Sequence, residues 1–114
     1  MAVKQIVRPG RFSEEVWADN RRIEFDFKNE SIISTGCPVD TVFFGDSITH
    51  YWEIGAYFTG REGLLVNRGI GGDNTTYALR RLEADVLQLH PKRCVVMIGV
   101  NDAWDMEADN SCLV

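Results

Sequence analysis

The sequence predicts an α/β domain built on a short parallel sheet. Three short runs rich in β-branched or aromatic residues, 41–44, 64–67 and 94–98, are apolar without alternation, which is typical of strands buried on both faces. Each segment between them exceeds the roughly one dozen residues that a parallel crossover needs. Strands separated by helical connections form parallel sheets with right-handed crossovers, so α/β is the expected class.

A helix over residues 13–29 is expected to come first. Ser13 is a helix-start residue, acidic residues follow it in the first turn, and apolar residues then recur at helical spacing. These apolar positions are Val16, Ile23 and Phe27. Residues 34–40 are expected to form a loop into the first strand, because Gly36 and Pro38 interrupt the helical pattern.

The clearer crossover helix precedes the third strand. Four apolar residues fall at positions i, i+3, i+7 and i+10 with mostly polar residues between them, and Pro91 follows the last. The four are Leu79, Leu82, Val86 and Leu89. This spacing predicts a helix with one apolar face.

Composition and charge exclude several functional classes. The chain of 114 residues is long enough for one domain, and its net charge of −5 with scattered basic residues argues against nucleic-acid or anionic-membrane partners. It has neither a run of about 18 apolar residues nor the apolar region of a signal peptide, so we expect a cytoplasmic protein. Cys37, Cys94 and Cys112 fit neither a disulfide framework nor a zinc pattern, and we expect buried or idle thiols, no metal and no cofactor.

A polar turn containing glycine follows each predicted strand. The turns read "GDSIT", "RGIGGDNT" and "GVNDAW". In an open parallel sheet they lie on one edge, at the carboxyl ends of the strands, where ligands bind. The sequence therefore predicts a site at this edge.

The first turn offers Ser47 as a nucleophile. It stands where a strand gives way to a helix, so its hydroxyl is expected to be exposed and its N–H to be available to a developing negative charge. A serine in this position is more often only a helix cap. The turn is not the G-x-S-x-G elbow of α/β-hydrolases, because Thr49 replaces the second glycine.

The second and third turns offer hydrogen-bond donors. A dinucleotide site is disfavoured because Asn74 stands where G-x-G-x-x-G needs its last glycine. The glycines instead let the backbone approach a substrate, with the N–H of Gly72 as a donor. Asn101 has an amide that can donate to an oxyanion and lies beside Asp102, although either residue can merely shape a turn. A nucleophile and two donors on one sheet edge are the parts of an acyl-transfer site.

At this point the sequence resembles a known family. "FFGDSIT", "NRGIGGDNTTYALRRLE" and "VVMIGVNDAW" resemble the first three motif blocks of the SGNH, or GDSL, hydrolases, and the middle block is most similar to the platelet-activating-factor acetylhydrolase branch. The resemblance covers residues 38–104 of a single domain, with an N-terminal helix and loop at 1–37 and a tail at 105–114. It implies a three-layer, flavodoxin-like α/β fold, truncated to about three parallel strands with flanking helices.

The resemblance also assigns roles. Ser47 matches the nucleophile of a serine esterase acting on a small-molecule ester, and Ser47, Gly72 and Asn101 match the residues that supply its oxyanion donors. Asp46 matches a position expected to hold the turn. The remaining candidate binding residues are His50, Asp73, Asn74 and Asp102.

The family's histidine and aspartate, in a late D-x-x-H block, have no counterpart in this sequence. His90 is expected at the far end of the third strand, on the order of 20 Å from the site. His50 is nearer, but side chains three positions apart on one helix point along the same face, so a pocket-wall or surface role is favoured over a base. Trp52 and Trp104 flank the site, where packing is the commoner role.

Three hypotheses follow. The chain is the amino-terminal part of an esterase, impaired because its base is absent; or it is a non-catalytic binding or structural module; or a neighbouring subunit supplies the histidine. The resemblance implies the strand order second, first, third, which leaves the apolar third strand as a bare edge. Such an edge predicts a homo-oligomer formed through that strand.

Overall fold

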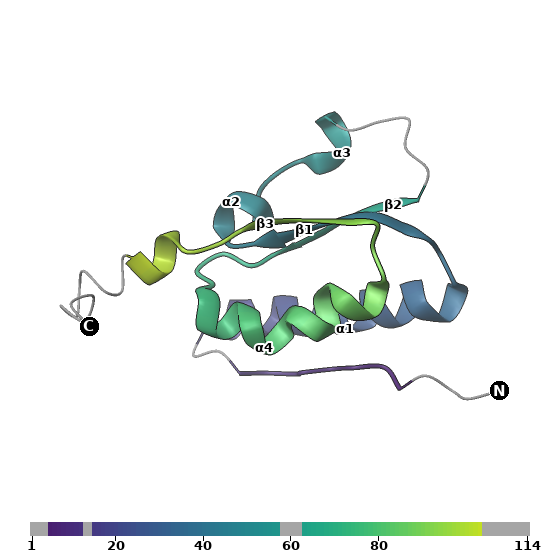
Figure 1. Ribbon diagram of the computed structural model, residues 1–114. Coiled ribbons are helices and arrows are strands. Elements are labelled where there is room, and N and C mark those ends of the chain that lie inside the picture. Colours follow the sequence, from purple (N-terminus) through teal and green to yellow (C-terminus); the bar gives the residue numbers. More distant parts are fainter. Residues whose placement is uncertain (1–4, 13–14, 58–62, 104–114) are drawn as a thin grey trace.

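The computed structural model of the chain describes residues 5–12, 15–57 and 63–103. A parallel sheet of three strands forms its centre, in the order β2-β1-β3. The strands are β1 (Val39–Gly45), β2 (Leu64–Gly69) and β3 (Arg93–Met97). Helices α1 (Val16–Thr35) and α4 (Thr75–Asp85) lie on one face, and the short helices α2 (Ser47–His50) and α3 (Ile54–Tyr57) lie on the other (Figure 1). The predicted α/β class and strand order are confirmed.

Element boundaries differ from the prediction mainly in α1. This helix continues to Thr35, six residues past the expected end at 29, because no breaker occurs before Gly36. Gly36 ends the helix in the left-handed conformation (φ 69°), which glycine adopts without steric cost. Residues 13 and 14, the expected start, lie outside the described residues. The second crossover is divided between α4 and a 3₁₀ turn, η1 (Leu87–Leu89).

The hydrophobic core lies between the sheet and the pair α1 and α4. Val42 and Phe44 of β1 belong to it, and Phe43 between them packs edge-to-face on Trp52 with ring centroids 5.2 Å apart. This alternation follows from the pleat of a strand. The buried members of the core cluster are Val39, Val42, Phe44, Val66, Ala78, Val86 and Leu89.

The prediction that all three strands are buried on both faces is wrong for β3 and only partly right for β2, where Leu64 is exposed and Leu65 and Asn67 are half-buried. All seven residues of β1 are buried, whereas all five of β3 are exposed, with Val96 at 53%. The cause is topology: β1 is central, and β3 is an edge strand paired only with β1 among the described residues.

The expected apolar face is wrong for α1 and only partly right for the second crossover, where Leu82, Val86 and Leu89 pack in the core but Leu79 does not. Val16 and Phe27 of α1 and Leu79 of α4 are exposed, Leu79 by 73%. The facing sides instead bury polar residues: Arg22 and Asn29 from α1, and Arg81 and Asp85 from α4. Asn29, Arg81 and Asp85 tolerate burial because they bond to one another and to the backbone. Arg22 bonds to Asp73 through Nη2, whereas its Nε and Nη1 have no hydrogen-bond partner among the described residues.

The N-terminal segment 5–12 runs beside α1 and α4 on the side away from the sheet (Figure 1). The Gln88 side chain holds it through the backbone of Val7: the Val7 N–H donates to Oε1 at 2.9 Å, and Nε2 donates to the Val7 carbonyl at 3.0 Å. Among the helices of the described part of the chain, none combines the length and apolar character needed to cross a membrane.

Candidate active site

The turns that follow the three strands meet at one edge of the sheet. The Ile70 N–H donates to the Gly45 carbonyl at 3.0 Å, and the Asp46 N–H donates to the Met97 carbonyl at 3.4 Å. A Cβ on Gly45 would lie only 2.2 Å from the Met97 carbonyl oxygen, so glycine is needed for this approach. The chain segments after β1, β2 and β3 are thereby held in direct contact.

Ser47 begins α2 at this edge and is partly exposed. The Asp46 carboxylate accepts a hydrogen bond from the Ile48 N–H at 3.1 Å, which holds the turn around the serine. The Ser47 Cβ lies 3.5 Å from the point where a Cβ on Gly71 would stand. The predicted nucleophile therefore faces the glycine turn after β2.

The turn after β2 presents bare backbone beside Ser47. Gly72 is exposed and has φ 81°, a conformation that an L side chain rarely adopts. The indole of Trp17 lies over this turn, with its ring carbons 3.3 and 3.5 Å from the points where a Cβ on Gly71 and on Gly72 would stand. Trp17 was missed by the sequence reasoning, because its apolar character fits an ordinary helix position equally well.

Asn101 reaches the same turn from the helical turn at residues 100–103. Its Nδ2 donates to the Asp73 carbonyl at 2.8 Å, which engages one of the two amide N–H groups. The structure therefore brings Ser47, Gly72 and Asn101 together around one short stretch of backbone.

Two other candidate binding residues secure the start of α4. The Asn74 Oδ1 accepts from the Tyr77 N–H at 2.9 Å, as a helix N-cap. The Asp102 carboxylate accepts from the Thr75 N–H at 3.0 Å and from its hydroxyl at 2.5 Å. Both side chains make bonds within the protein that fix the turns in place.

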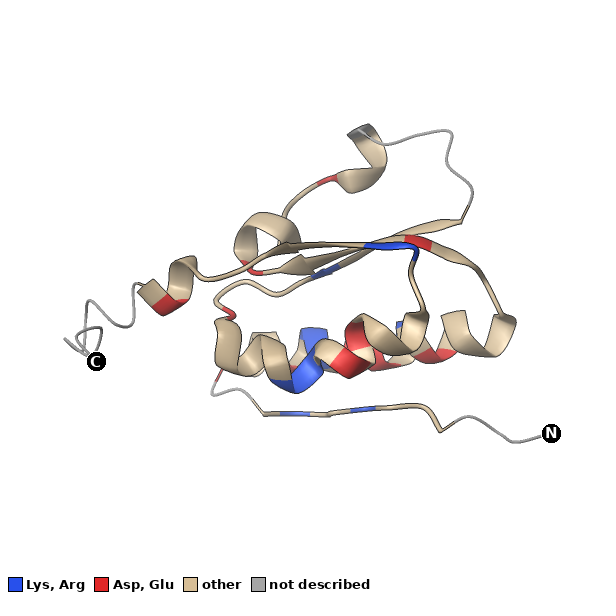
Figure 2. Ribbon diagram, in the orientation of Figure 1, with Lys and Arg blue, Asp and Glu red and all other residues tan. Residues whose placement is uncertain are grey.

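Asp73 is buried between two arginines. Its carboxylate accepts from Arg22 Nη2 at 2.5 Å and from Arg81 Nε at 2.7 Å. Burial raises the pKa of the Asp73 carboxyl, and the guanidinium groups of Arg81 and Arg22 oppose that rise. Figure 2 shows basic and acidic residues side by side on α1 and α4, the two helices that supply these charges. Sequence reasoning missed both arginines, and the one signal available was the i, i+4 spacing of Arg81 and Asp85.

Residues 43–114, which include Ser47, Gly72 and Asn101, match the GDSL-like lipase/acylhydrolase family. The chain belongs to this family.

The alignments with two relatives cover most of this chain but less than half of each relative. It is 33% identical to the uncharacterized lipoprotein YqeF of Bacillus subtilis (strain 168), over 62% of this chain and 37% of that protein. It is 26% identical to the solved structure of a protein from Streptococcus pneumonia provisionally described as a platelet activating factor, with a TM-score of 0.60. That alignment covers 83% of this chain and 45% of the other. The chain thus spans less than half the length of either relative, and because one of them is called a lipoprotein, a cytoplasmic location stays a prediction.

The His50 side chain is hydrogen-bonded to the glycine turn of this GDSL-like site. Its Nδ1 accepts a hydrogen bond from the Gly71 N–H at 3.0 Å, and its ring stacks on Tyr51. Burial lowers the pKa of the His50 imidazole, and the positive charge of Arg21 lowers it further. A neutral imidazole that accepts at Nδ1 has its proton on Nε2, so neither nitrogen is available to take a proton from Ser47 while this bond stands.

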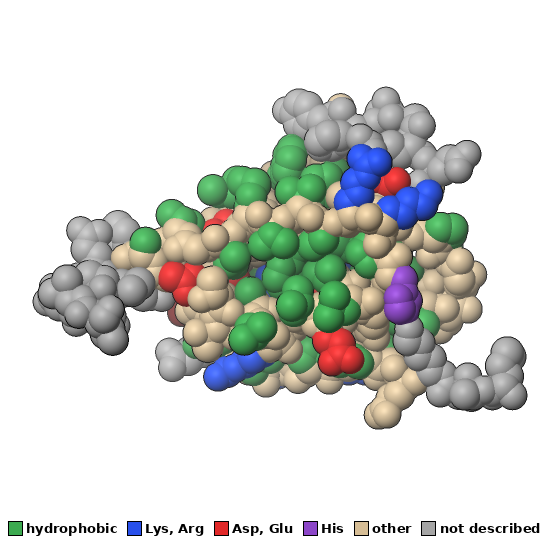
Figure 3. Space-filling model, viewed as in Figure 1, with side chains coloured by type: hydrophobic (Ala, Val, Ile, Leu, Met, Phe, Trp, Pro, Cys, Tyr) green, Lys and Arg blue, Asp and Glu red, His purple; other side chains and the backbone are tan. Residues whose placement is uncertain are grey.

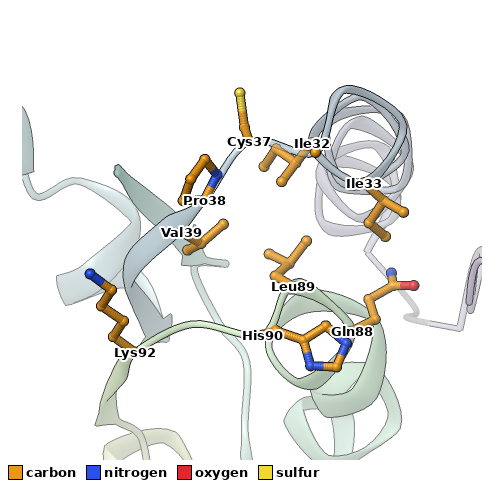
Figure 4. A pocket seen from close by; sticks show the side chains of 10 residues that line it. Ile32, Ile33, Cys37, Pro38, Val39, Gln88, Leu89, His90 and Lys92 are labelled. Carbon is orange, nitrogen blue, oxygen red and sulfur yellow. The ribbon is translucent and has the colours of Figure 1, made fainter. Parts of the chain in front are cut away.

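His90 lies at the opposite end of the sheet, just before β3. It helps to line a cavity of about 330 Å³ between the end of α1, the start of β1 and η1 (Figure 4). This cavity is remote from Ser47, because it lies where the strands begin and the serine lies where they end. Its lining residues are Ile32, Ile33, Gly36, Cys37, Pro38, Val39, Gln88, Leu89, His90 and Lys92.

The described part of the chain contains no group of three or more His, Cys, Asp and Glu residues arranged to hold a metal ion. Cys37 and Cys94 are free thiols and exposed, so of the two expected alternatives, buried or idle, burial is wrong for these two, and Cys112 lies outside the described residues. Trp104 also lies outside the described residues.

Proposed function

We propose that this chain carries the nucleophile and the oxyanion donors of a serine ester hydrolase. Ser47 Oγ attacks the carbonyl carbon of a carboxylic ester, and N–H groups of Ser47, Gly72 and Asn101 donate to the carbonyl oxygen as it becomes negatively charged. The alcohol then leaves with a proton, and water releases the carboxylic acid from the serine. The convergence of the three turns is the observation that carries this proposal.

The reaction also needs a base that takes the serine proton and returns it to the leaving alcohol. The sequence contains two histidines. His50 uses its Nδ1 lone pair for the Gly71 N–H, and His90 lies at the other end of the sheet. We propose that the base comes from outside residues 1–114. Without this base, we expect the chain to retain weak esterase activity. Serine proteases that lack one triad residue still accelerate hydrolysis by roughly 10³ to 10⁴-fold over the reaction in water.

Chemical rescue by imidazole tests this proposal. Added imidazole replaces the missing base, so hydrolysis of p-nitrophenyl acetate by the chain is expected to exceed that by a Ser47→Ala variant, with a difference that grows as imidazole is added. The Ser47→Ala protein corrects for hydrolysis by imidazole itself. Equal rates for the two proteins at every imidazole concentration would reject Ser47 as the nucleophile. A serine-directed phosphonate is expected to react slowly without imidazole, for the same reason.

A second candidate function is a self-associating module without turnover. The specific observation in its favour is the β3 edge, whose Val95, Val96 and Met97 are all exposed. Figure 3 shows hydrophobic side chains gathered on the face of the molecule over β3 and the neighbouring side of α4. An edge strand with exposed apolar side chains is a template for pairing with another chain, so we propose a second copy of this chain as the partner.

A further inference from the structure

We propose that Arg81 is a positioning residue of the Ser47 site, which fixes the serine turn relative to the glycine turn. This inference rests on the proposed ester hydrolase function and deepens it. Arg81 belongs to α4 and is fully buried, so it does not touch substrate. It acts through the two turns that it connects.

The guanidinium of Arg81 bonds to both turns at once. Its Nη2 donates to the Gly45 carbonyl at 3.0 Å, two residues before Ser47. Its Nε donates to the Asp73 carboxylate at 2.7 Å, one residue after Gly72. The nucleophile and a backbone oxyanion donor are therefore held to a single planar group.

The guanidinium is itself held rigidly. Its Nη1 donates to the Arg68 carbonyl at 2.8 Å, near the end of β2, and to the Asp85 carboxylate at 3.1 Å. One face of the group lies 4.4 Å from the centroid of the Phe44 ring. A planar fork with fixed donors suits this arrangement, whereas the ammonium of lysine is a single point on a flexible stem and cannot span the same set of acceptors.

The Gly71 end of the glycine turn is held by His50, and the end beyond Gly72 is held through Asp73, so we expect the Gly72 donor to depend on the Arg81 anchor. Asp73 supplies the anchor on both sides: its carboxylate bonds to Arg81 and also to Arg22, and its carbonyl accepts from Asn101 Nδ2. Oxyanion donors are effective only when preorganised, and a misplacement of about 1 Å costs up to about 10²-fold in rate. Loss of the Arg81 anchor is therefore expected to weaken catalysis more than a general loss of stability explains.

The experiment compares two reactions of one thiol. In a chain carrying Ser47→Cys, with Cys37, Cys94 and Cys112 replaced by serine, the thiolate introduced at position 47 reacts without a base. Acylation by p-nitrophenyl acetate builds an oxyanion, whereas alkylation by iodoacetamide is a displacement that builds none. The ratio of the two rate constants measures the oxyanion donors, and thiol exposure and pKa affect both reactions.

Arg81→Lys is expected to lower the acylation rate constant by at least about tenfold, with the alkylation rate constant changed less than about twofold. Asp85→Asn is the matched control: it removes the charge of a partner of Arg81 on α4 itself but keeps an acceptor oxygen there and both bonds to the turns, so the ratio is expected to stay unchanged. Circular dichroism and thermal unfolding check the fold. If Arg81→Lys does not fold, Asp73→Asn, which removes the charge that Arg81 and Arg22 both contact, is expected to lower the ratio in the same direction.

An unchanged ratio in a folded Arg81→Lys or Asp73→Asn protein would overturn the inference, and so would an equal loss in Asp85→Asn. Failure of the proposed function looks different. A second control chain keeps Ser47 and has the exposed Cys37 as its one thiol. If the proposed function is wrong, the ratio of acylation to alkylation rate constants in the Ser47→Cys parent would equal the ratio in this control chain. A raised parent ratio that is insensitive to Arg81 would reject the positioning role alone.

Discussion

The serine helix α2 packs closely against the end of β2. A Cβ on Gly69 would lie 2.2 Å from the His50 backbone nitrogen, so α2 rests directly on the end of β2. The His50 ring then reaches Gly71, and the Asn67 amide donates to the Thr49 carbonyl at 2.8 Å on the same helix. The serine helix is thus held on the β2 side of the sheet by a close backbone approach that requires Gly69 and by hydrogen bonds made by the side chains of His50 and Asn67.

The His50 contact predicts a pH dependence of stability. Because the pKa of His50 is lowered in the folded protein, the unfolded chain binds this proton more readily. The contribution of His50 to the free energy of unfolding is complete above its unfolded pKa of about 6.5, and it decreases as the pH falls through that value toward the lower folded pKa. Protonation also removes the Nδ1 lone pair that accepts from Gly71.

Urea unfolding at pH 7.5 and 5.5 measures this effect. The wild type is expected to lose more stability between the two pH values than His50→Asn, whose Oδ1 can accept the Gly71 N–H and does not titrate. His90→Asn serves as the control for the other histidine and is expected to keep the wild-type dependence on His50. The same loss in the wild type and in His50→Asn would contradict the prediction.

At the scale of elements, polar contacts between distant segments replace much of the apolar packing that the helical patterns predict. Asn29 of α1 donates to the Ala84 carbonyl and to Asp85 of α4, and its oxygen accepts from Arg68 at 2.8 and 3.0 Å. Burial lowers the pKa of the Arg68 guanidinium to about 10. These bonds specify one arrangement of α1 against α4, because a rotated or shifted helix would leave buried charges without acceptors.

The Gln88 contact predicts that one side chain secures the N-terminal segment. Gln88→Leu keeps an apolar filling but removes both bonds to the Val7 backbone, so stability is expected to fall by about 1–2 kcal/mol. Amide hydrogen exchange at Val7 is expected to accelerate at the same time. Leu87→Ala, at the neighbouring exposed position, is the control and should change neither quantity much. Unaltered exchange at Val7 in Gln88→Leu would show that other contacts hold the segment.

At the scale of the whole molecule, the sheet is asymmetric. Its central strand is buried throughout, and its β3 edge is exposed along its full length. The Cys94 thiol lies on this exposed strand, and neighbouring atoms that exclude part of the solvent raise its pKa, so the thiol stays protonated at neutral pH. Within the described part of the chain, this edge therefore offers apolar side chains together with backbone that pairs on one side only, the combination that favours strand pairing.

This asymmetry predicts self-association through β3. Sizing at several protein concentrations is expected to show a dimer that dissociates on dilution, with a thermal midpoint that rises with concentration. Val96→Lys places a charge on the exposed edge and is expected to give a monomer with a midpoint independent of concentration. Glu83→Lys, an exposed substitution on α4, is the control for added positive charge. A well-folded wild type that is monomeric at every concentration would reject the proposal.

The order of the strands was implied by the family resemblance, whereas the sequence by itself determined the three strands, their parallel orientation and the three turns that form the candidate site. Each of these follows from local information: short apolar runs make strands, long connections force parallel crossovers, and parallel strands bring their carboxyl-end turns to one edge. The family match then agrees with the same stretch of chain.

Only the tertiary structure decided what the charged residues do. Arg22 and Arg81 have the helical spacing of ordinary surface residues, yet they are the largest of the fully buried side chains in the described part of the chain. The Asp73 carboxylate bonds to both, and backbone carbonyls accept from Arg81. His50 likewise faces Gly71, a residue 21 positions away. Contacts of this range depend on how α1, α4 and the turns pack together, and no local spacing encodes them. Apolar runs therefore indicated the strands, and the contacts of buried polar groups decided how α1, α4 and the turns pack around the site.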